Sequence, residues 1–242
     1  MFAPCLKVPE GAGSAGQSYI GRTLEDVAMD NKNHWSKIYQ TKGADQVSWY
    51  QTSPALSLYM IQRTGIALDE PIIDVGAGAS TLVDHLLTMN YQNITLLDLS
   101  AEALQIARSR VSDRSVALTW LEGDVTAISL PEHHYAVWHD RAVFHFLTDA
   151  DARRRYINQV SRSVKPGGHV IIATFALDGP EKCSGLDVVR YDVSSLHAEF
   201  GDHFKLLWDT NKTHHTPWGT EQQFIYCYCR IQPNTTASEP SS

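Results

Sequence analysis

The stretch from Pro71 to Ser80 constrains the fold of this chain more than any other. It reads Pro-Ile-Ile-Asp-Val-Gly-Ala-Gly-Ala-Ser, a short apolar strand that ends in an acid and is followed by a Gly-Ala-Gly turn into a helix. Such a turn brings bare backbone and the unpaired N–H groups of a helix N-terminus against a ligand. The pattern therefore predicts a nucleotide-like cofactor at the carboxyl edge of a parallel sheet.

The segments on either side repeat a strand-then-helix pattern. Apolar runs that read as strands alternate with runs whose apolar residues recur at helical spacing, and two final strands are joined by a short turn. The predicted strands are the short run that ends at Asp74 and residues 94–98, 116–121, 135–138, 169–176, 204–210 and 222–231. We therefore expect an α/β fold with a Rossmann-like seven-stranded sheet, mostly parallel with an antiparallel terminal strand, and helices on both faces.

Length and composition suggest one domain with short flanking segments. Residues 1–28 are rich in small residues and are expected to form a flexible extension, residues 29–231 the domain, and residues 232–242 a disordered tail. A net charge of −7 argues against a dedicated nucleic-acid binder. No apolar run is long enough to span a membrane, and the scattered cysteines indicate a reducing compartment, so we expect a cytoplasmic protein.

Three acids follow consecutive predicted strands: Asp74, Asp98 and Asp124. Each alone is equally explained as a helix cap or a turn residue. Because the carboxyl ends of parallel strands meet at one edge of a sheet, the three carboxylates are expected at the same edge, where such sheets bind ligands. Carboxylates there can accept hydrogen bonds from ribose hydroxyls or amino groups.

With these acids in place, the chain resembles the class I S-adenosylmethionine-dependent methyltransferases. Asp74-Val-Gly76-Ala-Gly78 matches their first motif, Asp98 the acid that holds the ribose, and Gly123-Asp124-Val125 the acid near the adenine. The resemblance implies that S-adenosylmethionine is the cofactor and S-adenosylhomocysteine the product. It also implies which residues bind the cofactor: Asp74, Gly76, Gly78, Asp98, Leu99, Asp124 and Val125.

A nicotinamide-dependent dehydrogenase is the competing interpretation. Its fingerprint requires Gly-x-Gly-x-x-Gly, but counting from Gly76 the last position is Thr81. The turn Lys165-Pro166-Gly167-Gly168 and the antiparallel terminal strands also favour a methyltransferase. A third possibility is a protein that binds the cofactor without turnover.

The acceptor site is expected just after the fourth strand, at His139, Asp140 and Arg141. His139 can titrate near neutrality and is predicted to line the methyl-transfer site and contact the cofactor. Arg141 is predicted to orient an anionic substrate, and Asp140 to position one of the two. The alternative is that Asp140 and Arg141 pair with each other and that His145 packs in the helix.

Further residues can complete the pocket. Trp35 and Tyr39 share one face of a helix and could cover the cofactor, where aromatic rings stabilise a positive sulfur, or could simply pack on the sheet. Cys183 and Tyr191, after the fifth strand, could face the substrate, although a lone cysteine is as often an inert buried thiol. The adjacent pair His214-His215 would point to opposite strand faces, so we predict no metal site.

The acceptor itself is less constrained. The string Asp140-Arg141-Ala142 resembles thiopurine-type methyltransferases, whereas His34-Trp35 with Tyr39 and the following Trp49-Tyr50 resembles small protein-lysine methyltransferases. We expect a small nucleophile with a sulfur or nitrogen acceptor, and a protein lysine as the alternative. A closed pocket roofed by Trp35, Tyr39 and Cys183 would favour the small molecule, and an open acidic groove the protein.

Overall fold

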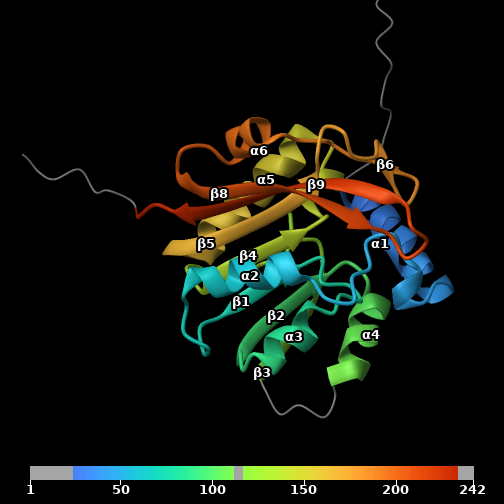
Figure 1. Cartoon of the computed structure of the whole chain (residues 1–242), viewed down its shortest axis with the longest axis horizontal. Helices are drawn as coiled ribbons and strands as arrows, with labels where there is room; N and C mark the ends of the chain where they lie inside the picture. Colours follow the sequence, from blue (N-terminus) through green and yellow to red (C-terminus); the bar gives the residue numbers. More distant parts are fainter. Residues whose placement is uncertain (1–23, 112–116, 234–242) are drawn as a thin grey trace, which may run out of the picture.

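The computed structural model describes residues 24–111 and 117–233, which form a twisted sheet with helices on both faces (Figure 1). The main sheet has seven strands in the order β3-β2-β1-β4-β5-β9-β8. Its strands are β1 (Ile72–Val75), β2 (Asn93–Asp98), β3 (Ala117–Glu122), β4 (Tyr135–Arg141), β5 (Val164–Phe175), β8 (Phe204–His215) and β9 (Glu221–Ile231). A separate small hairpin consists of β6 (Lys182–Cys183) and β7 (Leu186–Asp187).

The pairing confirms the predicted sheet. Strands β3, β2, β1, β4 and β5 are parallel to one another, whereas β9 is antiparallel to both of its neighbours. The last strand of the chain, β9, lies between β5 and β8, so β8 forms the edge. The reversal of the chain order at β1 and β4 opens a crevice beyond the carboxyl ends of these two strands.

Helices cover the two faces as the apolar periodicity predicts. The helices are α1 (Leu24–Thr41), α2 (Ala55–Thr64), α3 (Leu82–Thr88), α4 (Ala101–Val111), α5 (Ala150–Ser163) and α6 (Val193–Phe200), with the 3-10 turns η1 (Ala44–Gln46) and η2 (Phe144–Phe146). Side chains alternate along β1: Ile72 packs with α2 and α3, whereas Ile73 packs with α5 and α6. Among the described residues, no helix is long and apolar enough to cross a membrane.

The predicted boundary of the N-terminal extension is wrong by several residues. Helix α1 begins at Leu24, so residues 24–28 are helical rather than part of a flexible extension. Residues 1–23 and 234–242, which include most of the predicted extension and tail, lie outside the described residues.

Helix α1 is tied to α4, and this contact places it over the carboxyl edge of the sheet. Ser36 Oγ and Gln40 Nε2 each donate a hydrogen bond of 2.7 Å to the carboxylate of Glu102 in α4. Glu102 also accepts a hydrogen bond from Ser100 Oγ, just before α4 begins. The position of α1 matters because it carries Trp35 and Tyr39.

Candidate active site

The Gly-Ala-Gly turn after β1 can be built only from glycine at its first and third positions. Gly76 and Gly78 have φ angles of +65° and +48°, which side-chain-bearing residues rarely adopt. A Cβ on Gly76 would lie 2.0 Å from Cγ2 of Val143. A Cβ on Gly78 would lie 2.6 Å from the hydroxyl of Tyr39. The glycines therefore let the turn fit tightly between the loop after β4 and helix α1.

A cavity of about 660 Å³ opens beside this turn, at the carboxyl edge of the sheet. This volume lies in the range of sites that hold small organic ligands. Most of the predicted cofactor-binding residues line it: Trp35, Tyr39, Gly76, Asp98, Leu99, Asp124 and Val125. Gly78 does not line the cavity and acts through its close approach to Tyr39.

Asp98 ends β2, Asp124 follows the end of β3 by two residues, and both carboxylates line this cavity with lone pairs to spare. Asp98 Oδ1 accepts the N–H of Ser100 at 2.8 Å, and Asp124 Oδ1 accepts the N–H of Thr126 at 2.7 Å. Burial raises the pKa of Asp98 to about 6. Each carboxylate can still accept a hydrogen bond from a ligand hydroxyl or amine.

Aromatic rings from three segments form one wall of the cavity. Trp35 of α1 meets Trp49 and Phe146 edge-on, with ring centroids 5.6 Å and 5.1 Å apart. Tyr39 packs edge-on against Trp49 at 6.3 Å. Burial raises the pKa of Tyr39, so its hydroxyl stays neutral. The wall is therefore apolar with one hydroxyl, and it encloses the side of the cavity covered by α1.

Arg141 is a half-buried cation that has no anionic partner among the described residues. Its Nε donates to the hydroxyl of Tyr226 at 3.1 Å and its Nη1 to the carbonyl of Trp49 at 3.0 Å, while the guanidinium lies 4.6 Å from the centre of the Phe224 ring. Its Nη2 is buried without a hydrogen-bond partner among the described residues. Arg141 lines the large cavity, so a bound anion could complete its interactions.

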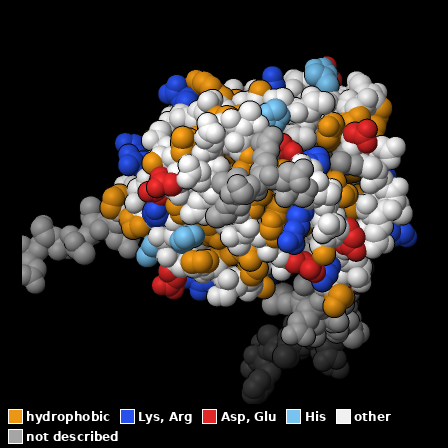
Figure 2. Space-filling view, turned by 90° about the horizontal axis from the view of Figure 1, so that it is seen from below, with side chains coloured by type: hydrophobic (Ala, Val, Ile, Leu, Met, Phe, Trp, Pro, Cys, Tyr) orange, Lys and Arg blue, Asp and Glu red, His pale blue; other side chains and the backbone are white. Residues whose placement is uncertain are grey.

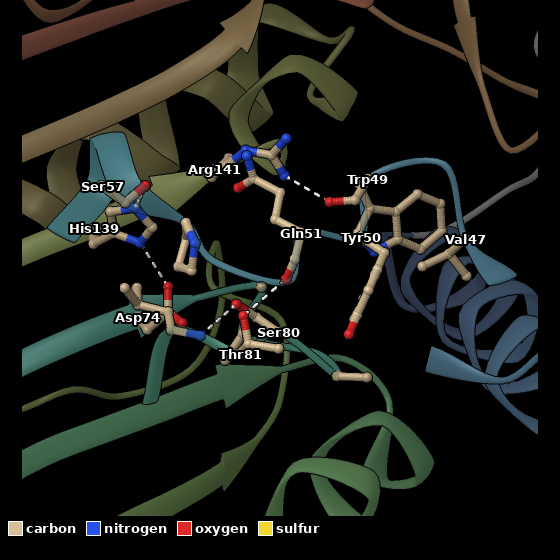
Figure 3. A pocket seen from close by; sticks show the side chains of 15 residues that line it. Val47, Trp49, Tyr50, Gln51, Ser57, Asp74, Ser80, Thr81, His139 and Arg141 are labelled. Atoms are coloured by element: carbon tan, nitrogen blue, oxygen red, sulfur yellow. Dashed lines mark hydrogen bonds and ion pairs between the residues drawn. The ribbon is translucent and has the colours of Figure 1, made fainter. Parts of the chain in front are cut away.

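A second, smaller cavity of about 50 Å³ adjoins the first and shares Trp49, Gly76 and Arg141 with it (Figure 3). Asp74, which the sequence predicts to bind the cofactor, lines this cavity and not the larger one. His139 Nδ1 lies 2.7 Å from Asp74 Oδ1, and its Nε2 lies 2.9 Å from Ser57 Oγ.

The structure places His139 at the small cavity and not at the large one. His139 is 3% exposed, both of its ring nitrogens have partners, and it lines the small cavity only. The cause is strand register: Asp74 and His139 are paired on neighbouring parallel strands, so their side chains point to the same face, toward α2. There His139 meets Ser57, which sequence reasoning missed.

The expected role of Asp140 is wrong. Its Oδ1 accepts the N–H of Val143 at 2.9 Å, and its Oδ2 accepts the N–H of Phe144 at 3.1 Å. The hydroxyl of Tyr156 donates a further bond to Oδ2. Because neighbouring residues of a strand alternate between faces, Asp140 points toward α5, away from His139 and Arg141. The predicted alternative, an Asp140–Arg141 ion pair, is not formed within the described residues either.

Cys183 lies on β6 and lines the large cavity. Burial raises the pKa of its thiol to about 11, so at neutral pH it is an uncharged wall residue and not a nucleophilic thiolate. Tyr191 lines neither cavity and packs instead against Phe144. His145 packs in the core, as the alternative predicted: its Nδ1 accepts the N–H of Phe175 at 3.3 Å, and burial lowers its pKa to about 3.

The adjacent histidines of β8 point to opposite sides, as expected from strand geometry. His214 is buried with its Nε2 2.7 Å from the carbonyl oxygen of Ser48, whereas His215 is exposed. Within residues 24–111 and 117–233, no group of three or more His, Cys, Asp and Glu side chains is placed to hold a metal ion.

Comparisons with known proteins agree with this geometry. A family model described as a methyltransferase domain matches residues 72–168, from the first residue of β1 to Gly168 within β5. The eEF1A lysine and N-terminal methyltransferase of Bos taurus is 26% identical over 150 residues, which cover 60% of this chain and 21% of that protein. The ubiquinone biosynthesis O-methyltransferase of Serratia proteamaculans is 28% identical over 160 residues, covering 65% of this chain and 64% of that one.

The chain thus spans between about a fifth and two thirds of these two relatives. A solved structure, the 1,6-didemethyltoxoflavin-N1-methyltransferase of Burkholderia thailandensis with S-adenosylhomocysteine, shares the fold. Its TM-score is 0.65 at 15% identity, with 89% of this chain and 93% of that one covered. Together, the matched methyltransferase domain, the strand order and the cavity at the glycine turn support a class I S-adenosylmethionine-dependent methyltransferase.

Proposed function

We propose that this protein transfers the methyl group of S-adenosylmethionine to a sulfur or nitrogen atom of a small nucleophile that carries an anionic group. The observation that carries the proposal is the guanidinium of Arg141, which lines the large cavity and whose buried Nη2 has no hydrogen-bond partner among the described residues. The proposal concerns the methyl acceptor, because the names of the two relatives given above point to different acceptors. One is named for lysine and the N-terminus of eEF1A, and the other for an oxygen acceptor in ubiquinone biosynthesis.

The donor groups of the site fit the cofactor. Asp98 would accept hydrogen bonds from the ribose hydroxyls, and Asp124 and Val125 would border the adenine, with Leu99 packed on its face. Asp74 and the glycine turn would border the methionine part. When bound, S-adenosylmethionine supplies a methyl group already activated by the sulfonium. The protein must therefore hold the acceptor in line and keep water out.

The acceptor end of the cavity favours an anion over a cation. A buried guanidinium without a counter-charge is costly, and a carboxylate on the acceptor would supply that charge with bidentate hydrogen bonds. A lysine ammonium placed there would meet a like charge instead. Trp35, Tyr39 and Cys183 all line the same cavity, as expected for a pocket that encloses a small molecule.

Arg141 also bears on how the acceptor loses its proton. The described residues that line the large cavity include no histidine that could act as a general base, since His139 lines the smaller cavity. A thiol beside a guanidinium ionises more easily, because the positive charge stabilises the thiolate. A thiol acceptor would therefore need less help from a base than an alcohol, which supports sulfur as the acceptor atom.

The alternative, a protein-lysine methyltransferase, draws its support from the relative in Bos taurus. Two further acids line the cavity, Asp149 and Asp187. Both already have partners: Asp149 caps α5 through the N–H of Ala152, and Asp187 pairs with Lys182 at 2.8 Å. On the face shown in Figure 2, acidic and basic side chains are interspersed, so neither sign dominates its described part. These features favour the small acceptor.

A screen that reads out S-adenosylhomocysteine tests the proposal. Thiols and amines would be offered in pairs that differ only in a carboxylate, beside lysine-containing peptides and proteins. We expect turnover with a carboxylate-bearing thiol or amine and at least about tenfold lower kcat/KM for its neutral partner, the usual loss when a charge-assisted hydrogen bond is removed. Turnover confined to lysine side chains would contradict the proposal.

A further inference from the structure

Ser57, His139 and Asp74 form a continuous buried chain of hydrogen-bonding groups that crosses from α2 to β4 to β1 (Figure 3). All three are nearly inaccessible, with exposed fractions of 1%, 3% and 4%. The chain lies in the small cavity beside the glycine turn, and no step proposed above for the acceptor uses Ser57 or His139.

The chemistry of the three groups fixes where the protons lie. An ionised carboxylate only accepts hydrogen bonds, so the contact with Asp74 requires a proton on Nδ1 of His139. In the neutral imidazole, Nε2 is then an acceptor, and it must receive the hydroxyl proton of Ser57. Ser57 thereby selects the tautomer of His139 that can donate to Asp74.

This arrangement leaves one oxygen of Asp74 available. Oδ1 accepts from His139, whereas Oδ2 accepts no hydrogen bond from any described residue. Because Asp74 lines the small cavity, this oxygen can bind a cationic group placed there. Arg141 also lines this cavity and would repel a cation, so a cationic group there would bind at Asp74.

We propose that Ser57 and His139 are positioning residues that hold Asp74 as an oriented carboxylate for the ammonium group at the amino-acid end of the cofactor. The proposal rests on the use of S-adenosylmethionine and is independent of the acceptor. The hydrogen bond from His139 to Oδ1 fixes the orientation of the carboxylate.

A purely mechanical role is the competing explanation, since the same contacts also fasten α2 to the sheet. The two explanations differ in what the ligand must contain. A positioning role affects ligands that carry the ammonium group, and a mechanical role affects every ligand of the site. S-adenosylhomocysteine contains the amino-acid end, and 5′-methylthioadenosine lacks it while keeping the ribose and the adenine.

Titration calorimetry with these two ligands on the full chain provides the test, with two variants of His139 as a matched pair. The amide of asparagine reaches the position of Nδ1, so His139→Asn can still donate to Asp74, although it loses Ser57. The longer glutamine reaches the position of Nε2, so His139→Gln keeps Ser57 and loses Asp74. Ser57→Ala removes the group that selects the tautomer.

We expect His139→Gln to bind S-adenosylhomocysteine about tenfold more weakly than wild type, and His139→Asn to stay within about threefold. Ser57→Ala should weaken that ligand about fivefold, an intermediate effect. All three variants should bind 5′-methylthioadenosine within about threefold of wild type. Equal losses for both ligands, or a greater loss in His139→Asn than in His139→Gln, would overturn the proposal.

Wild-type protein that bound neither ligand would overturn the proposal together with the proposed function. Wild-type protein that bound both ligands, with variants that weakened both alike, would overturn only the role given to Ser57 and His139. Circular dichroism of each variant confirms that the compared proteins are folded.

Discussion

The hydroxyl of Tyr156 donates a hydrogen bond of 2.5 Å to Oδ2 of Asp140, and this contact fastens α5 to the loop that follows β4. The same carboxylate holds the N–H of Val143, whose Cγ2 occupies the space that a side chain on Gly76 would need. The core on one face of the sheet thus fixes the loop that borders the glycine turn. The shape of the cofactor cavity depends on a buried acid that does not line it.

Tyr156→Phe should destabilise the protein. The variant removes a hydrogen bond to a buried carboxylate and leaves the indole N–H of Trp138 without the partner that it has at 2.9 Å. Bonds to charged groups contribute about 1.5–3 kcal/mol, so we expect the free energy of unfolding to fall by about that amount. Urea titration measures it, with Tyr228→Phe as the control. The control loses a half-buried bond to His169 and should cost about 1 kcal/mol or less. If both variants lost the same free energy of unfolding, the bond from Tyr156 to the buried carboxylate of Asp140 would have no special importance for stability, which would contradict the account.

The contribution of Asp140 to the stability of the ligand-free protein should fall as the pH rises from about 4 to about 6. Burial raises the pKa of Asp140 from 3.8 to about 6 in the folded protein. The folded state therefore binds this proton more tightly than the unfolded state, and loss of the proton favours unfolding. Burial lowers the pKa of His145 to about 3, which acts in the opposite direction on the whole protein, so the test compares wild type with Asp140→Asn. Urea unfolding of both proteins at a series of pH values measures the difference between their free energies of unfolding. We expect the advantage of wild type over Asp140→Asn to shrink between about pH 4 and about pH 6, and a constant difference would contradict the shift at Asp140.

Gly76→Ala should lose both stability and cofactor binding, and Gly65→Ala is its matched control. The two glycines have nearly the same φ angles, +65° and +69°. A Cβ on Gly76 meets Val143, whereas nothing lies within 4 Å of a Cβ on Gly65. Gly65→Ala should therefore cost about 1–2 kcal/mol of backbone strain and leave S-adenosylhomocysteine binding unchanged. Gly76→Ala should cost more and weaken binding, as measured by thermal unfolding with and without the ligand. Indistinguishable variants would show that space at Gly76 is not limiting.

Asp98→Asn should weaken every ligand that contains the ribose. The variant replaces a carboxylate, which accepts from two hydroxyls, with an amide that offers one acceptor. We expect about tenfold weaker binding of both S-adenosylhomocysteine and 5′-methylthioadenosine by calorimetry. Because the pKa of Asp98 is raised to about 6, wild-type affinity for 5′-methylthioadenosine should also fall below about pH 6. Unchanged binding in the variant would remove Asp98 from the ribose site.

The sheet and the cofactor side of the site were predictable from the sequence for one physical reason. Parallel strands bring their carboxyl ends together, so acids such as Asp98 and Asp124 that follow consecutive strands must meet at one edge. The order and direction of the strands followed from apolar runs of strand length separated by helical patterns. None of this requires knowledge of contacts between distant side chains.

The roles of His139 and Asp140 required such knowledge. Alternation along β4 shows that neighbours point to opposite faces, but which face meets the cavity depends on where α2 and α5 pack. Ser57 contacts a residue 82 positions away. Its only local signal is a polar side chain on the buried stripe of α2, in register with Met60 and Ile61. The sequence likewise left open whether Cys183 is a reactive or an inert thiol, because its burial is set by the packing of the β6–β7 hairpin.

The central claim is that Arg141 binds an anionic group of a small methyl acceptor, and kinetics of Arg141→Gln measured on a matched acceptor pair test it most directly. The pair consists of the best carboxylate-bearing acceptor and its neutral analogue, with S-adenosylhomocysteine as the readout and its affinity measured separately by calorimetry. The account predicts that the variant lowers kcat/KM for the anionic acceptor at least about tenfold, leaves that for the neutral analogue within about threefold, and keeps cofactor affinity. Loss of affinity for S-adenosylhomocysteine in Arg141→Gln, with kcat/KM lowered equally for both acceptors, would indicate that Arg141 binds the carboxylate of the cofactor and not the acceptor. That result would contradict the account.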